Sequence, residues 1–62
     1  MLYKRIEELC KSKGITVGKL ENDLSFSHAM IRKWKSSSPS VENLKKVADY
    51  FDITVDELIS EM

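Results

Sequence analysis

The chain has 62 residues, a formal net charge of zero, one cysteine and one histidine. A chain this short cannot bury two cores, so we expect residues 1–62 to form one domain. A lone cysteine excludes an internal disulfide, and the residue types for a structural zinc site are missing, so we expect no metal or other cofactor. The chain start is too charged for a signal peptide and no stretch reaches transmembrane length, which predicts a cytoplasmic protein without membrane contact.

The charges are distributed unevenly along the chain. All ten lysines and arginines fall within residues 1–46 together with five acids, which gives this part a net charge of +5. Residues 47–62 carry five acids and no lysine or arginine, a net charge of −5. This asymmetry favours one face that meets a polyanion and another that is turned away from it. Ordinary solvated helix faces are the alternative explanation.

The spacing of apolar residues predicts an all-α fold of five short helices and no strand. The expected helices span residues 2–13, 17–24, 28–35, 41–51 and 55–60. The expected N-caps are hydroxyl residues, namely Thr16, Ser27, Ser40 and Thr54. Thr54 and Glu57 also have the spacing of a capping box, and Gly14 can end the first helix in a left-handed conformation.

The helical spacing also predicts which side chains form the core. The expected core residues are Ile6, Leu9, Leu20, Leu24, Ile31, Trp34, Leu44, Val47, Ala48, Phe51, Ile53 and Leu58. Cys10 lies on the inward side of the first helix, so we interpret it as a small core residue and not as a nucleophile.

Three residues, Ser25, Phe26 and Ser27, separate Leu24 from the third predicted helix. Two helices joined by so short a turn cross steeply, which is the helix-turn-helix arrangement. The third helix, at about 12 Å, fits a major groove about 12 Å wide. Its expected outward residues are His28, Ala29, Arg32, Lys33 and Lys35. A helical hairpin used only for packing shows the same spacing.

Several segments together resemble one known family. They are residues 14–20 (GITVGKL), 24–27 (LSFS), 31–35 (IRKWK) and 53–58 (ITVDEL), with Pro39-Ser40, Leu44, Val47-Ala48 and Phe51 between them. In these segments the chain resembles the lambda-repressor-like helix-turn-helix family of phage and bacterial transcriptional regulators. The resemblance covers nearly the whole chain. It implies a five-helix domain, binding to operator DNA, frequent dimerisation and no catalysis.

The resemblance also implies which residues meet DNA. Base edges or adjacent phosphates would be approached from Ser27, His28, Ala29, Arg32 and Lys33. Phosphate contacts would come from the start of the second helix and from beyond the third, at Thr16, Val17, Lys35 and Ser36. Helix amino ends, hydroxyls and long cationic side chains suit these roles.

Three positions depart from the family pattern. Ser25 stands where the family often has glycine, and such a position tends to demand a left-handed backbone. Val17 replaces a frequent glutamine, which removes one base and phosphate partner. Glu21 replaces a frequent alanine, and we expect its side chain to point to solvent and not into the helix crossing.

These features predict a sequence-specific regulator, of the phage or prophage repressor type, that binds double-stranded operator DNA as a homodimer and has no small-molecule substrate. The expected dimer contact uses Val55, Ile59 and Met62. His28 and Cys10 are the one pair that suggests an enzyme, and no triad partner or phosphate loop accompanies them. The stronger alternative is an interaction module of the same fold, antirepressor or antitoxin-like, with little DNA binding.

Overall fold

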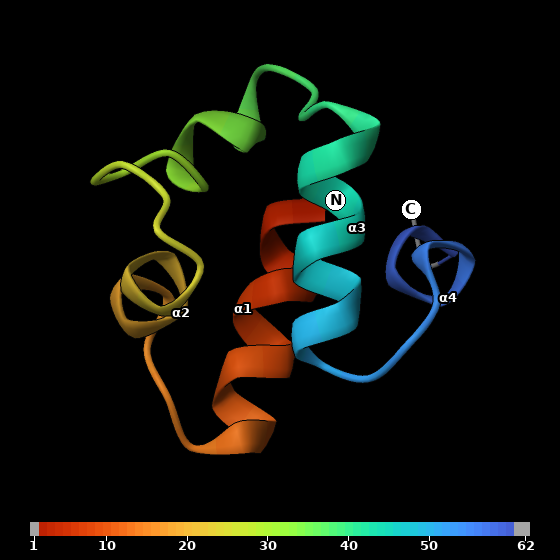
Figure 1. The fold of residues 1–62 in the computed structure, drawn as a ribbon, viewed down its shortest axis with the longest axis horizontal. Coiled ribbons are helices and arrows are strands. Elements are labelled where there is room, and N and C mark those ends of the chain that lie inside the picture. Colours follow the sequence, from red (N-terminus) through yellow and green to blue (C-terminus); the bar gives the residue numbers. More distant parts are fainter. Residues whose placement is uncertain (1, 61–62) are drawn as a thin grey trace.

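The computed structural model describes residues 2–60, and this part of the chain is helical throughout its regular structure (Figure 1). Its elements are α1 (Leu2–Lys13), α2 (Val17–Asp23), the 3₁₀ helix η1 (Arg32–Lys35), α3 (Val41–Tyr50) and α4 (Val55–Ile59). The all-α class is confirmed, but the structure has four α-helices where the sequence predicts five. The predicted helix over residues 28–35 is replaced by a turn and η1. Within residues 2–60, no helix has the length and apolarity to cross a bilayer.

α1, α2 and α3 each end in a left-handed residue followed by an apolar one. The left-handed residues are Gly14, Ser25 and Asp52, with φ of 76°, 60° and 58°. After α2, for example, the N–H of Phe26 donates to the Glu21 carbonyl (2.8 Å) and the N–H of Ser25 to the Asn22 carbonyl (3.2 Å). This pair of bonds is a Schellman motif, which satisfies carbonyls that the helix end leaves free. The same pattern recurs at Gly14 and Asp52, so all three helices end through local chemistry.

Three of the four predicted N-caps are confirmed. The hydroxyl of Thr16 accepts the Lys19 N–H, and that of Ser40 accepts the Asn43 N–H. Thr54 forms a capping box with Glu57. Ser27, the fourth, begins no helix, so its predicted role as an N-cap is wrong.

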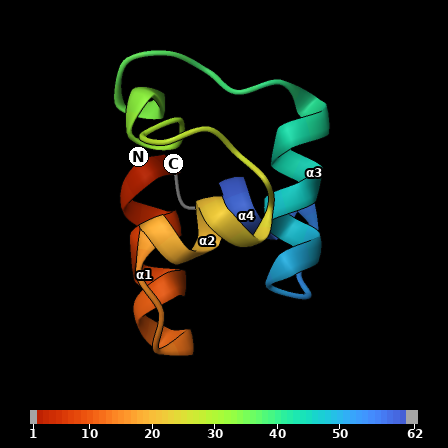
Figure 2. The same cartoon turned by 60° about the vertical axis from the view of Figure 1, so that its left-hand side comes forward.

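The core lies where α1 packs against α2, η1 and α4, and α4 packs in turn against α3 (Figure 2). Its buried apolar residues are Leu2, Ile6, Cys10, Leu20, Ile31, Trp34, Val47, Ala48 and Leu58. Cys10 is thus a core residue, as predicted. Leu9, Leu24, Leu44, Phe51 and Ile53 were also predicted to lie in the core, and they are half-buried and packed against it.

A polar contact joins α2 to the end of α3. The hydroxyl of Tyr50 donates to Oδ2 of Asp23 (2.6 Å), and Nζ of Lys19 lies 3.2 Å from the same carboxylate. The hydrogen bond from Tyr50, followed by the one from Lys19, lowers the pKa of Asp23. The same bond raises the pKa of Tyr50, because the neutral hydroxyl is the donor. At neutral pH both shifts favour an ionised Asp23 carboxylate that accepts the hydrogen bond from a neutral Tyr50 hydroxyl.

Acid is therefore expected to weaken the domain partly through Asp23. A carboxyl whose pKa is lowered by folding contributes stability that is complete above its unfolded value, about 3.9, and is lost as the pH falls through the lower folded value. Tyr50→Phe removes the main cause of the shift, so its urea midpoint should fall less steeply between about pH 5 and pH 2 than that of the parent. Tyr3→Phe, on α1, is the control. Parallel curves for Tyr50→Phe and the parent would show that this contact does not stabilise the fold.

Candidate nucleic-acid interface

The turn after α2 fixes where the following segment starts. Ser25 has the left-handed backbone that the sequence predicts for this position, at φ 60°. Phe26, the next residue, packs against the core, and its ring meets that of Trp34 edge to face at a centroid distance of 6.0 Å. Residues 27–36, which we call the recognition segment, are therefore anchored at one end by this turn and further along by Trp34.

Ser25→Gly is expected to raise the free energy of unfolding by about 1 kcal/mol, because glycine adopts a left-handed backbone without the strain of a Cβ. A shift of the denaturant midpoint at constant slope measures it. Gly14→Ala is the reciprocal control: its φ is 76° and an added Cβ meets nothing within 4 Å, so its cost comes from the backbone alone. If Ser25→Gly leaves the midpoint unchanged, the turn is not strained.

The recognition segment is not the α-helix that the sequence predicts. Residues 28–31 form a turn, with Ala29 left-handed at φ 63°, and η1 follows. Most of its backbone bonds span three residues, such as Met30 N–H to the Ser27 carbonyl (3.1 Å) and Trp34 N–H to the Ile31 carbonyl (3.0 Å). These bonds belong to turns and 3₁₀ helices, which rise about 2 Å per residue. The predicted eight-residue α-helix across the major groove is therefore absent from this conformation.

A side chain of α2, Glu21, contacts this turn. It points inward and is only 6% exposed, which contradicts the expectation that it would point to solvent. Oε2 accepts the N–H of Ile31 at 2.9 Å. A helix starting at Ser27 would give that N–H to the Ser27 carbonyl, which instead accepts from Met30. A buried carboxylate needs such a donor, and here it takes one from the recognition segment.

Two large apolar residues of the recognition segment, Ile31 and Trp34, face inward despite the different backbone. Ile31 is fully buried and Trp34 is buried at 8% exposure. The polar residues Ser27, His28, Arg32, Lys33, Lys35 and Ser36 are exposed, and Ala29 is half-buried. Ile31 and Trp34 thus keep their predicted inward positions, because η1 keeps residues three apart on one side. Four of the five residues predicted to face outward are exposed, and Ala29 is the exception.

A shallow hollow of about 210 Å³ joins α2 to the recognition segment. Its lining residues are Tyr3, Val17, Gly18, Glu21, His28, Ala29 and Arg32. Four of them, Val17, His28, Ala29 and Arg32, belong to the predicted DNA-binding set. The structure therefore brings the start of α2 and the start of the recognition segment onto one surface.

Lys33, Ser27 and Ser36 do not line this hollow, nor does Thr16. Lys33 is an exposed residue of η1, next to Arg32. Thr16 is exposed at the start of α2, and its hydroxyl accepts the Lys19 N–H at 3.1 Å.

Two residues of this surface escape the sequence prediction. Tyr3 lies under Lys35, whose Nζ is 4.7 Å from the centre of the tyrosine ring, within the range of a cation–π contact. No sequence pattern connects these two residues, which are 32 positions apart. Glu21 is the second. It lies four residues after Val17, hence on the same face of α2, and this spacing was a signal that the two residues line one hollow.

A family comparison decides the class of the domain. The model of a family described as helix-turn-helix matches residues 6–58. The chain belongs to this family of transcription regulators. The chain is also 34% identical over 59 residues to an HTH-type transcriptional activator of Enterococcus faecalis, BcrR, covering 92% of the chain. The match spans 29% of that relative's length. No solved structure matches significantly. Membership in this family supports DNA-binding transcription regulation as the general function.

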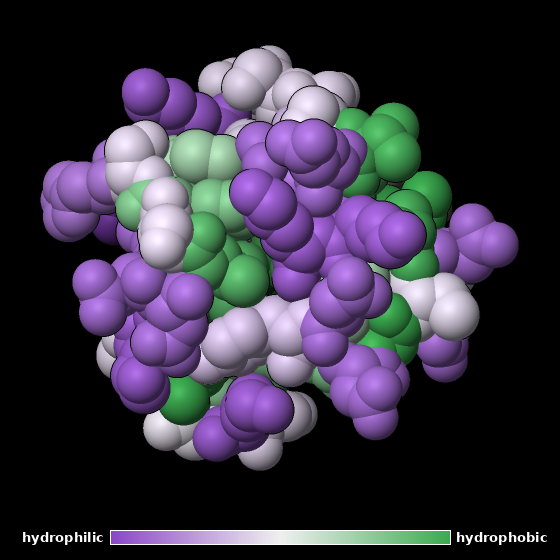
Figure 3. All heavy atoms as spheres, in the orientation of Figure 1, coloured by the Kyte–Doolittle hydropathy of each residue, from purple (hydrophilic) through white to green (hydrophobic). Residues whose placement is uncertain are grey.

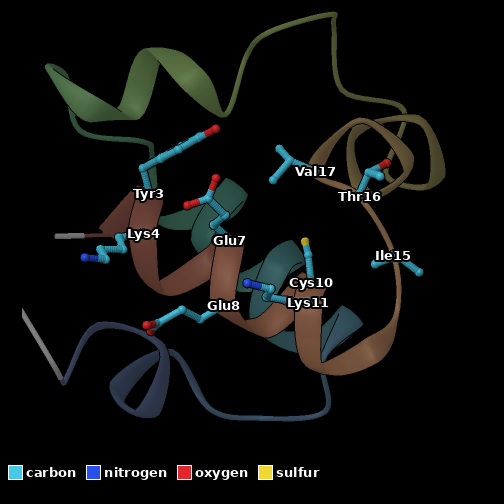
Figure 4. Close-up of a pocket in the computed structure, with 9 residues that line it drawn as sticks. All are labelled: Tyr3, Lys4, Glu7, Glu8, Cys10, Lys11, Ile15, Thr16 and Val17. Atoms are coloured by element: carbon cyan, nitrogen blue, oxygen red, sulfur yellow. The ribbon is translucent and has the colours of Figure 1, made fainter.

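A second hollow of this helix-turn-helix domain, about 550 Å³, lies between α1 and the start of α2 (Figure 4). Cys10 points toward Thr16 and Val17 in this view. Burial, and then the nearby charge of Glu7, raise the pKa of the Cys10 thiol, which keeps it protonated and weakly nucleophilic at neutral pH. His28 does not line this hollow. Among residues 2–60, no three His, Cys, Asp or Glu side chains are grouped to hold a metal ion.

The residues expected at a dimer contact follow the DNA-binding set in the chain, in α4 and beyond it. Val55 and Ile59, the first and last residues of α4, are half-buried and pack against the core. Met62 lies outside the described residues. Apolar side chains on the face in Figure 3 appear in patches between hydrophilic ones. Val55 and Ile59 are thus the part of the predicted dimer contact that the structure describes.

Proposed function

We propose that this domain binds a specific operator in double-stranded DNA, with the recognition segment in the major groove, as the DNA-binding part of a phage-type repressor. The observation that carries the proposal is the cationic row Arg32, Lys33 and Lys35, exposed on a segment that Ile31 and Trp34 hold against the core. Cations presented from an anchored segment can reach both phosphates and guanine acceptors.

The residues predicted to contact DNA then fall into two groups with different roles. Arg32, Lys33, Ser27, His28 and Ala29 approach base edges or adjacent phosphates, where Arg and Lys favour guanine and an alanine methyl suits thymine. Phosphate contacts from the start of α2 and from the end of the segment fix the orientation of the domain without selecting sequence. The residues for these contacts are Thr16, Val17, Lys35 and Ser36.

Selection of bound duplexes from a random library tests the proposal. A common motif of a few base pairs per domain is expected, and a pool without sequence preference would contradict it. Placing the selected motif over a promoter then tests the direction of regulation. A repressor lowers reporter output, because the bound domain excludes other proteins from the same stretch of DNA, whereas a rise would assign activation, as in the name of the Enterococcus relative.

The other candidate is an interaction module of the same fold, antirepressor or antitoxin-like. The observation that favours it is the recognition segment itself, whose turn at residues 28–31 differs from a groove-length helix. An interaction module gives no salt-dependent binding to duplex DNA, so a titration of the domain with duplex DNA across ionic strength separates the two functions.

We also propose that two copies bind one operator through a two-fold axis, presenting their recognition segments to successive major grooves about 34 Å apart. A single domain has few strong base contacts, and a second copy doubles them. Ile59→Asp should break the contact by burying a charge between the two α4 helices and weaken operator binding. Sedimentation with the selected duplex counts the copies. Val41→Asp, at the 76% exposed start of α3, is the control. One parent copy per site, or undiminished binding by Ile59→Asp, would refute the dimer.

A further inference from the structure

The buried carboxylate of Glu21 is the starting point. Among residues 2–60 it is the one charged side chain that is buried, and its hydrogen bond is to the backbone of the recognition segment. It also lines the hollow beside His28, Ala29 and Arg32. A negative group is therefore in place at the surface that the proposed function turns toward DNA phosphates.

The N–H of Ile31 has two possible acceptors, and they exclude each other. In the structure Glu21 Oε2 accepts it, and the Ser27 carbonyl accepts the Met30 N–H instead. In an α-helix starting at Ser27, the Ser27 carbonyl would accept the Ile31 N–H and Glu21 would lose its donor. The choice of acceptor thus selects between a turn and a helix at residues 28–31.

The turn carries a strain that the helix would not. Ala29 has a φ of 63°, a region that alanine rarely occupies because its Cβ approaches the following carbonyl. In a helix Ala29 would have an ordinary backbone and a high helix propensity. The bond to Glu21 therefore stabilises the strained turn.

We propose that Glu21 is a positioning residue that holds the recognition segment as a turn in the free domain, and that duplex DNA binds the alternative state in which residues 28–35 are helical. This inference rests on the proposed function. The helical state presents His28, Ala29, Arg32 and Lys33 along about 12 Å, which suits the major groove. DNA phosphates near Glu21 also disfavour the turn, because the turn keeps the negative carboxylate at this surface. DNA binding therefore has to displace Glu21 from the Ile31 N–H. The observed affinity is that of the helical state multiplied by the fraction of the free domain that is helical.

The test compares Glu21→Ala with Glu21→Gln. Both remove the negative charge, but the glutamine amide oxygen can still accept the Ile31 N–H, so the pair separates the hydrogen bond from electrostatics. Carbon chemical shifts of residues 28–31 in the free domain report the backbone, and a titration with the selected duplex reports the affinity. Glu21→Gln should keep the turn shifts. Glu21→Ala should show helical shifts and bind about tenfold more tightly than Glu21→Gln, the factor that corresponds to the loss of one hydrogen bond that stabilises the turn.

Equal affinities of the two variants would overturn the inference, because charge alone would then explain the effect. Chemical shifts typical of the turn at residues 28–31 of Glu21→Ala would overturn it as well. If Glu21→Ala does not fold, Ala29→Gly takes its place as the test variant. Glycine adopts a φ of 63° without strain and weakens a helix, so this variant should have a higher melting temperature than the parent and bind the duplex more weakly. Parent-like binding by Ala29→Gly would also contradict the inference. If the parent domain binds no duplex, the proposed function is wrong. The carbon chemical shifts of residues 28–31 in the free variants then still show whether Glu21 holds the backbone as a turn.

Discussion

Leu20→Ala is expected to remove most of the stability of the domain. Leu20 is fully buried and anchors α2, which has seven residues and would not be helical alone. Truncating such a leucine costs about 2–5 kcal/mol, because it loses both transfer free energy and packing around the cavity. A domain of this size has a free energy of unfolding on the order of 3–9 kcal/mol, so the variant should be partly unfolded at room temperature.

Circular dichroism against temperature and urea measures the loss. Val41→Ala is the matched control, because Val41 is 76% exposed and its truncation should change stability by no more than about 0.5 kcal/mol. A Leu20→Ala variant that melts within a few degrees of the parent would show that α2 is held by other contacts.

DNA affinity is expected to fall about a thousandfold between 50 and 200 mM salt. In the proposed dimer, Arg32, Lys33 and Lys35 from two copies would neutralise about six phosphates, and each displaced counterion contributes about 0.9 to the logarithmic slope. Replacing Arg32 and Lys33 with glutamine should reduce that slope to about one third, since four of the six cations are lost. Fluorescence anisotropy with a labelled duplex across ionic strength gives both slopes.

Lys45→Gln with Lys46→Gln is the matched control. These lysines make the same change in charge but lie on α3, which does not line the hollow between α2 and the recognition segment. Their slope should stay near that of the parent. If both double variants lower the salt slope equally, the lysines and arginines act through the total positive charge of the domain and not through the recognition segment.

The sequence predicts the helices well where their ends depend on local chemistry. α1 has the predicted bounds, and α2, α3 and α4 end within one residue of theirs. Thr16, Ser40 and Thr54 cap helices because a hydroxyl reaches an amide three residues ahead. The left-handed Ser25 was also predictable, because its position in the turn demands that conformation whatever residue occupies it.

The sequence predicts an α-helix over the recognition segment because no local pattern indicates the hydrogen bond from the Ile31 N–H to Glu21, ten positions earlier. Helical spacing correctly places Ile31 and Trp34 inside, since 3₁₀ and α-helices both return to one side after three or four residues. The spacing does not reveal that Glu21 is buried and takes the Ile31 N–H. The contact of Lys35 with the ring of Tyr3 is likewise tertiary, so helical spacing does not reveal it.

Chemical-shift mapping shows whether the recognition segment and the start of α2 form the DNA-binding surface. Isotope-labelled domain is titrated with the selected duplex and the backbone amide of each residue is followed. We expect the largest changes at residues 16–18 and 27–36, and little change at the exposed amides of α3. Changes centred on α3 or α4, with the recognition segment unaffected, would contradict this expectation.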